Sequence, residues 1–217
     1  MDRYKETFDT WNKVASLYQD KFMDLNLYDH TYDYIIDNLS PDQVKILELG
    51  CGPGNISKYL LSKRPDFDLF GIDIAPNMIE LSKLNNPNAQ FAVMDCRQID
   101  QLDSAYDAII VGFCLPYLSL SESRQLISNA ERLLNDHGLI YLSFVEGEPD
   151  KSGYITGSGG RVYFHYHLMS DLKAHLTKTN FDEIKTFQVK YKTSETEFDI
   201  HTILIGKKKN SLHRKSN

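Results

Sequence analysis

Short apolar runs alternate with longer stretches of mixed polarity along the first two thirds of the chain. The runs occupy residues 44–49, 69–74, 90–93, 107–113 and 139–145. Apolar runs of this length are typical of strands that a sheet buries on both faces. The stretches between them have apolar residues at helical spacing, as from Leu126 to Leu134, where Ser119 and Glu122 provide a capping box. The alternation predicts βαβ units around a parallel sheet.

The last third of the chain predicts a short helix and a hairpin. His137 and Gly138 indicate a break just before the fifth run, and residues 170–178 have the pattern of a short capped helix. The two following runs, 183–192 and 198–206, alternate their side chains as strands do. We expect these runs to form a hairpin that gives the sheet an antiparallel edge.

A glycine-rich run follows the first predicted strand and precedes a helical pattern. Its sequence from Glu48 to Gly54 is Glu-Leu-Gly-Cys-Gly-Pro-Gly. Glycines let the backbone turn tightly and approach a ligand, because they have no Cβ. The start of the following helix offers free N–H groups and a positive dipole end to a carboxylate or phosphate. The context indicates a nucleotide-binding loop, although an ordinary turn can have the same composition.

Asp73 ends the second apolar run, nineteen positions after Gly54. An acid about 20 residues beyond such a loop commonly binds the two ribose hydroxyls of an adenine nucleoside. A carboxylate can accept both hydrogen bonds at once. The alternative interpretation is a helix N-cap, which the following Pro76 would also suit.

The spacing of the glycines separates two classes of nucleotide-binding fold. Dinucleotide folds have the pattern G-x-G-x-x-G, whereas Gly50, Gly52 and Gly54 alternate as G-x-G-x-G, with Glu48 two places before them. This pattern resembles the first motif of the class I S-adenosylmethionine-dependent methyltransferases. The resemblance continues in that family's order: Asp73 is similar to its ribose-binding acid, and its adenine loop, fourth strand and fifth strand resemble residues 93–96, 106–111 and 133–142.

The resemblance implies a fold, a cofactor and a set of binding residues. The fold is α/β: a doubly wound, Rossmann-like, mixed seven-stranded sheet with an antiparallel C-terminal strand and N-terminal lid helices. The cofactor is S-adenosyl-L-methionine. Its carboxylate would meet the glycine-loop N–H groups, its ribose Asp73, its adenine Asp95, and its amino group Glu48, directly or through water. The residues implied to bind it are Trp11, Tyr18, Glu48, Gly50, Cys51, Gly52, Asp73, Ile74, Met78, Asp95, Cys96 and Phe113.

Residues 10–22 place aromatic side chains on one helical face, at Trp11, Tyr18 and Phe22. Packing against the core would explain such a face. In many small-molecule members of the family, however, N-terminal helices cover the cofactor with aromatic residues. Aromatic faces also attract cations such as a sulfonium. Trp11 and Tyr18 are therefore candidate lid contacts.

The segment after the fifth strand, residues 146–168, is the place where this family usually has an insertion over the substrate. It begins with polar residues and glycines, and it ends with His165 and His167, which would share one face of a strand. These histidines and Tyr117 are candidate substrate contacts or a general base. A metal pair is a weaker interpretation, since no third ligand is evident, and structural histidines are the simplest one.

These features predict a single domain over residues 1–217. Its expected parts are an N-terminal helical lid, a cofactor-binding core, a variable substrate loop, a final helix with a strand hairpin, and a tail. In that order, they occupy residues 1–40, 41–145, 146–168, 169–209 and 210–217.

Composition and charge narrow the expected partners and location. A formal net charge of −6 argues against a general nucleic-acid surface, and no apolar stretch approaches the roughly 18 residues of a membrane span. The charged N-terminus is unlike a secretion signal, and three cysteines without a Cys-x-x-Cys pair fit a reducing compartment. We expect a cytoplasmic monomer or homodimer with a small-molecule substrate, no nucleic acid and no membrane partner.

The function that the resemblance implies is S-adenosylmethionine-dependent methyl transfer to a small-molecule acceptor by in-line displacement. The transferred methyl group already sits on a positive sulfur, so the protein contributes mainly alignment and exclusion of water. Neither a metal site nor a catalytic triad is needed. The alternatives are a nicotinamide-dependent Rossmann oxidoreductase and a non-catalytic S-adenosylmethionine-binding protein.

Overall fold

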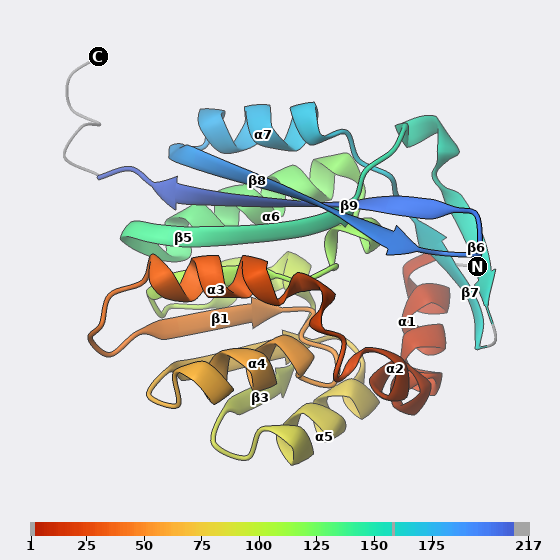
Figure 1. Cartoon of the computed structure of the whole chain (residues 1–217), viewed down its shortest axis with the longest axis horizontal. Coiled ribbons are helices and arrows are strands. Elements are labelled where there is room, and N and C mark those ends of the chain that lie inside the picture. The colour runs from red at the N-terminus through yellow and green to blue at the C-terminus, as the bar shows by residue number, and fades with distance from the viewer. Residues whose placement is uncertain (1–2, 158, 211–217) are drawn as a thin grey trace.

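A seven-stranded sheet forms the centre of the protein (Figure 1). The computed structural model describes residues 3–157 and 159–210. The strand order is β3-β2-β1-β4-β5-β9-β8, so the order reverses between β1 and β4. The strands are β1 Lys45–Leu49, β2 Asp68–Asp73, β3 Gln90–Val93, β4 Tyr106–Val111, β5 Leu134–Val145, β8 Phe181–Lys192 and β9 Phe198–Lys208. The predicted α/β class with a seven-stranded mixed sheet is confirmed.

Strands β1 to β5 run parallel, and helices cover both faces of the sheet. Neighbouring residues of a strand point to opposite faces. Ile46 therefore packs with α3 and α4, whereas Leu47 packs with α6 and α7. Because both faces are apolar, each strand appears in the sequence as a mostly apolar run. The helices of these layers are α3 Asp29–Asp37, α4 Asn55–Lys63, α5 Pro76–Asn85, α6 Leu120–Leu133 and α7 Met169–Lys178.

The predicted C-terminal hairpin forms one end of the sheet. Strand β9 pairs antiparallel with both β5 and β8. The antiparallel strand therefore lies one place inside the edge, and the edge strand β8 runs in the same direction as β1 to β5. The preceding helix α7 begins after Leu168, whose side chain makes no cap, so the predicted helix is present without the expected cap.

Two local predictions around α6 have different outcomes. The capping box of Ser119 and Glu122 is present at the start of α6. The break predicted at His137 and Gly138 is instead an irregularity inside β5, which begins directly after α6 at Leu134. The pairing with β4 slips at this point, and His137 takes a positive φ of 65°. The extra residues are accommodated as a bulge, because the flanking pairs continue the ladder.

Segments from distant parts of the chain meet beyond the carboxyl ends of the parallel strands (Figure 1). Helices α1 (Arg3–Lys13) and α2 (Ala15–Phe22) break at Val14, so the predicted helical face spans two helices. The predicted substrate loop contains a hairpin of β6 (Gly153–Gly157) and β7 (Gly160–Phe164).

Hydrogen bonds hold α1 against β7. The Tyr163 N–H donates to Thr7 Oγ1 at 3.0 Å, and Thr10 Oγ1 donates to the Arg161 carbonyl at 2.9 Å. An ion pair joins Arg161 to Glu6. The N-terminal helices and the later hairpin thus form one layer, which we call the cover (residues 3–22 and 153–164, except 158). Within the described part of the chain, no helix has both the length and the apolarity to cross a bilayer.

The bulge in β5 generates a stability prediction. A Cβ added at Gly138 would lie 2.9 Å from the Asn135 carbonyl oxygen and 3.0 Å from Leu134 Cδ2. We expect Gly138→Ala to lower the free energy of unfolding by about 1–3 kcal/mol, because the bulge must shift. Gly153→Ala is the control, since no atom lies within 4 Å of its added Cβ. Thermal unfolding measures both, and equal melting temperatures for the two variants would contradict the overpacking argument.

Candidate functional site

Two adjoining cavities lie beneath the cover, at the carboxyl ends of the strands. The first cavity is bounded by the glycine loop, the end of β2, the 3₁₀ helix η2 (Cys96–Gln101) and α1. The second cavity has a volume of about 400 Å³ and extends toward the start of β9 and the β6–β7 hairpin. The wall common to both contains Trp11, Tyr18, Gly50, Gly112, Phe113 and Tyr117. This is where a sheet with reversed strand order places its ligand.

The glycine loop makes the predicted tight turn between β1 and α4. Gly50, Gly52 and Gly54 have φ values of 66°, 53° and 81°. These left-handed angles strain any residue with a Cβ. A Cβ at Gly50 would also lie 3.0 Å from Cys114 Cβ. The glycines are therefore required by the turn, and Gly50 and Gly52 line the first cavity.

Asp73 fastens the glycine loop to the next turn. The Gly52 N–H donates to Asp73 Oδ2 at 2.9 Å, and the Ala75 N–H donates to Oδ1 at 2.8 Å. Ala75 is the N-cap residue of α5. By accepting from its N–H, the Asp73 side chain has part of the capping role considered above. Burial raises the pKa of Asp73 above its usual value, and the two N–H groups oppose the rise. Each oxygen keeps a lone pair for a further donor.

Glu48 is buried at the end of β1 and lines the second cavity together with Cys51. Ser57 Oγ donates a hydrogen bond to its carboxyl group. Burial, with a smaller contribution from the negative charge of Asp73, raises the pKa of Glu48 to about 8. The carboxyl group is therefore largely protonated at neutral pH, which lets two acids lie near each other under the loop.

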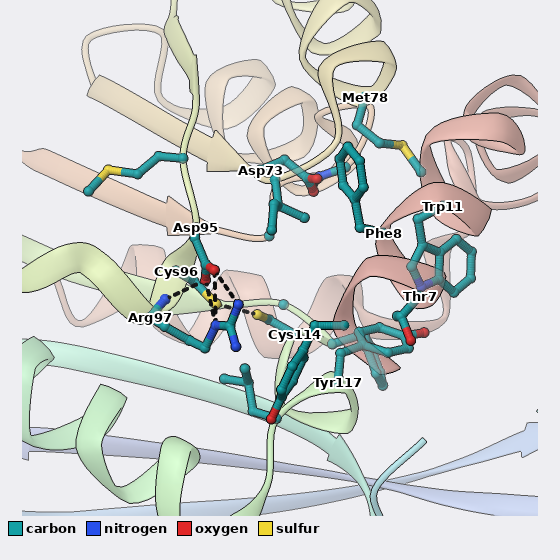
Figure 2. A pocket seen from close by; sticks show the side chains of 18 of the residues that line it. Thr7, Phe8, Trp11, Asp73, Met78, Asp95, Cys96, Arg97, Cys114 and Tyr117 are labelled. Atoms are coloured by element: carbon teal, nitrogen blue, oxygen red, sulfur yellow. Dashed lines mark hydrogen bonds and ion pairs between the residues drawn. The ribbon is translucent and has the colours of Figure 1, made fainter. Parts of the chain in front are cut away.

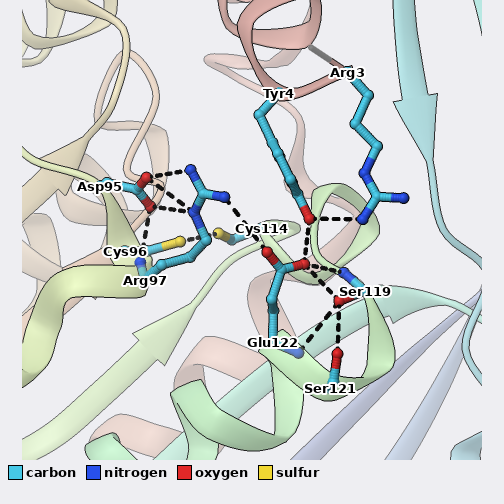
Figure 3. Close-up of polar contacts among 9 residues, drawn as sticks. All are labelled: Arg3, Tyr4, Asp95, Cys96, Arg97, Cys114, Ser119, Ser121 and Glu122. Atoms are coloured by element: carbon cyan, nitrogen blue, oxygen red, sulfur yellow. Dashed lines mark hydrogen bonds and ion pairs between the residues drawn. The ribbon is translucent and has the colours of Figure 1, made fainter.

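Asp95 lies at the other end of the first cavity and is held by Arg97, which the sequence analysis did not single out (Figure 3). The guanidinium donates from Nη2 to Asp95 Oδ2 at 2.6 Å, and from Nε to both carboxylate oxygens at 2.9 and 3.0 Å. Its charge also meets Glu122 at 3.4 Å and the ring of Tyr4 at 4.2 Å from the centroid.

Glu122 anchors this polar group to the start of α6. Burial opposes its ionisation, but hydrogen bonds from Ser119 and Tyr4 lower the pKa of Glu122 to about 2. Figure 3 shows Tyr4 reaching down from α1 to this carboxylate. A charged group therefore joins the cover to the wall of the first cavity. Tyr4 lines this cavity and was missed by the sequence analysis.

Aromatic and sulfur-containing side chains complete the first cavity (Figure 2). The rings of Trp11 and Tyr18 lie 5.5 Å apart, and Trp11 lies at the same distance from Tyr117. Nε1 of Trp11 is buried without a hydrogen-bond partner among the described residues. Cys96 Sγ lies 3.2 Å from Cys114 Sγ. The predicted residues that line this cavity are Trp11, Tyr18, Gly50, Gly52, Asp73, Ile74, Met78, Asp95, Cys96 and Phe113.

The histidine pair lies outside both cavities. Nε2 of the buried His167 donates to the Leu115 carbonyl at 3.0 Å. The ring of His165 stacks on it with centroids 6.3 Å apart, and burial lowers the pKa of His165 to about 4. In residues 3–157 and 159–210, no cluster of three potential metal ligands occurs. Neither histidine is among the described residues that line the two cavities, whereas Tyr117 borders both of them.

A different histidine, His201 on β9, lines the second cavity. Its Nδ1 lies 2.7 Å from the hydroxyl of Tyr28, and its ring stacks on Tyr191 with centroids 4.8 Å apart. Burial lowers the pKa of His201 to about 4. The sequence contains no local signal for this trio, because it joins a residue before β1 to two residues of the last hairpin.

Comparison with known proteins finds similarity to methyltransferases. Residues 46–138 match a family model described as a methyltransferase domain. The chain is 26% identical over 165 residues to the demethylmenaquinone methyltransferase of Thermotoga maritima, which covers 76% of this chain and 66% of that protein. It is 26% identical over 230 residues to the tRNA N(3)-methylcytidine methyltransferase of Schizosaccharomyces pombe, which covers 94% of this chain and 70% of that protein. The alignments span only 27% and 35% of two other curated relatives.

A solved structure has the same fold. The magnesium protoporphyrin IX methyltransferase of Synechocystis PCC 6803, solved with bound S-adenosylhomocysteine, superposes with a TM-score of 0.71 at 18% identity. The alignment covers 95% of this chain and 100% of that one. The family match covers the glycine loop, Asp73 and Asp95, which the structure brings to one cavity. The chain therefore matches a methyltransferase-domain model over residues 46–138 and has the fold of a solved S-adenosylmethionine-dependent methyltransferase.

Proposed function

We propose that the protein binds S-adenosylmethionine in the first cavity and transfers its methyl group to a small molecule in the second. The arrangement of the two cavities supports the proposal. A hydrogen bond joins the glycine loop to Asp73 in the wall of the first cavity, and this cavity shares a wall with the second. A cofactor and an acceptor held in these cavities would meet at the wall containing Phe113 and Tyr117. The family match favours methyl transfer over nicotinamide chemistry.

The residues present fit this cofactor. Asp73 would accept from the ribose hydroxyls, and Asp95, oriented by Arg97, would lie beside the adenine amino group. The space where a Cβ of Gly52 would stand has only Tyr18 within 4 Å, at 3.6 Å, which leaves room for the carboxylate end of the ligand. Glu48, once it has lost its proton, would attract the positively charged amino group of the cofactor. Trp11, Tyr18 and Phe113 present rings to a positive sulfur.

When bound, S-adenosylmethionine supplies a methyl group on a good leaving group. The chain's own residues then align the acceptor and exclude water, which is the larger part of catalysis in such a displacement. The cover would contribute through closure, because α1 lines both cavities, β7 lines the second, and Thr7 and Thr10 join the two elements. A base is required only where the accepting atom must lose a proton.

A small molecule is the acceptor that the second cavity favours over a nucleic acid. Among the described residues that line the second cavity, Lys21 is the only lysine or arginine, and the chain carries a net charge of −6. Nucleic-acid sites depend on clustered cations. Cys51, Cys96 and Cys114 are all free, which supports a reducing, cytoplasmic location. We further propose a monomer or homodimer.

Asp73→Ala tests the cofactor site. The variant should bind S-adenosylmethionine roughly 10–100-fold more weakly, because it loses a charged acceptor for two hydroxyls. Asp107→Ala is the matched control: its carboxylate also accepts two hydrogen bonds, from Lys45 N and Asn135 Nδ2, but at the amino end of β4. Calorimetry should find wild-type affinity in the control. Unchanged affinity in a folded Asp73→Ala protein would remove Asp73 from the site.

Glu48→Gln tests the buried acid through stability. The folded pKa of about 8 lies above the ordinary value of 4.5, so the unfolded chain releases a proton that the folded protein keeps. Stability is therefore full below pH 4.5 and falls as the pH rises toward 8. Gln cannot ionise, so the variant should gain melting temperature relative to wild type from pH 5 to pH 8. A difference in melting temperature that does not change with pH would contradict a raised pKa of Glu48 in the folded protein.

A further inference from the structure

Flat rings make up much of the second cavity beyond the shared wall. The ring of Tyr191 lies almost parallel to that of His201, at an angle of 9°. Phe164 and Tyr166, whose centroids are 5.1 Å apart, line the cavity from the side of the hairpin. Aromatic side chains stack on or meet the edge of other rings with a gain beyond area burial. This lining selects a planar ring system over a flexible chain.

The second cavity has little net charge. Lys21 and Asp199 carry opposite charges. Glu48 is largely protonated at neutral pH, and His201 is neutral there because burial lowers its pKa to about 4. No arginine is among the described residues that line it. An acceptor with several carboxylates or phosphates would enter this cavity without the cations needed to replace its water. The lining therefore favours an uncharged acceptor.

His201 provides one polar position among these rings. It is 7% exposed, and Nδ1 is engaged by the Tyr28 hydroxyl. Nε2 has no hydrogen-bond partner among the residues that the structure describes, although it belongs to a cavity-lining ring. A neutral imidazole fixed at one nitrogen can donate or accept one hydrogen bond at the other. A single polar group of the acceptor would satisfy it.

We propose that the second cavity binds an uncharged, planar aromatic acceptor whose hydroxyl or ring N–H group meets Nε2 of His201. This inference rests on the proposed function for the role of the ligand as acceptor. The binding itself depends only on the second cavity. Tyr28 is the positioning residue, because its hydroxyl fixes the orientation of the His201 ring.

Three probes of similar skeleton test the ligand class on the full chain by calorimetry, with no cofactor added. They are 2-naphthol, decahydro-2-naphthol, which is not planar, and 2-naphthalenesulfonate, which is planar and charged. We expect 2-naphthol to bind at least about 10-fold more tightly than either of the others. Equal or weaker binding of 2-naphthol overturns the proposal.

Variants test the position. Tyr191→Leu should weaken 2-naphthol binding about 10-fold, whereas Tyr154→Leu, which removes a ring outside both cavities, should not. His201→Phe keeps a ring but loses the polar atom, so it should weaken 2-naphthol about 5-fold and leave naphthalene unchanged. A 2-naphthol affinity that is unchanged in both cavity variants overturns the assignment. A separate measurement of S-adenosylmethionine binding distinguishes a failure of the proposed cofactor site in the first cavity from a failure of the aromatic site in the second.

Discussion

The hydrogen bond from the Gly52 N–H to Asp73 is the interaction on which the site depends. Parallel pairing brings the necessary ends together: Leu49 lies opposite Ile72 on one side and Val111 on the other. The loops after β1, β2 and β4 therefore leave the sheet side by side. The Asp73 contact and the Cys51 N–H, which donates to the Ile72 carbonyl at 3.0 Å, together fix the left-handed glycine turn relative to β2. The hydrogen bond thus helps to hold Gly52 and Asp73 together in the wall of the first cavity.

The cover is held in place by contacts between segments that lie far apart in the sequence. Thr7 and Thr10 of α1 bind the backbone of β7, and Tyr4 reaches Glu122 at the start of α6. Each contact crosses more than 100 positions of sequence. The same helix α1 thus bounds the first cavity and supports the hairpin that bounds the second. The shapes of the two cavities are consequently coupled through one short helix.

Local signals explain what could be predicted from the sequence. Burial on both faces makes the parallel strands mostly apolar, and left-handed turns favour glycine, so the sheet and the loop at Gly50 and Gly52 were predictable. The trio of Tyr28, Tyr191 and His201 was not, because only the completed sheet brings the last hairpin next to Tyr28. The sequence predicts a break before the fifth strand at His137 and Gly138, whereas the structure has a bulge there, because glycine suits a turn and a bulge alike. His165 and His167 are candidates by residue type alone, and neither is among the described residues that line the two cavities.

The distribution of charge divides recognition between the two cavities. Asp73 and Asp95 line the first cavity, which suits the proposed ligand with its sulfonium and ribose hydroxyls. The second cavity is lined by rings and has balanced charge. The two acids are placed by the parallel sheet, whereas many of the rings come from the cover, the segment before β1 and the last hairpin. Substitutions in the last hairpin are therefore expected to change the proposed acceptor site and not the proposed cofactor site, because Tyr191 and His201 line the second cavity and not the first.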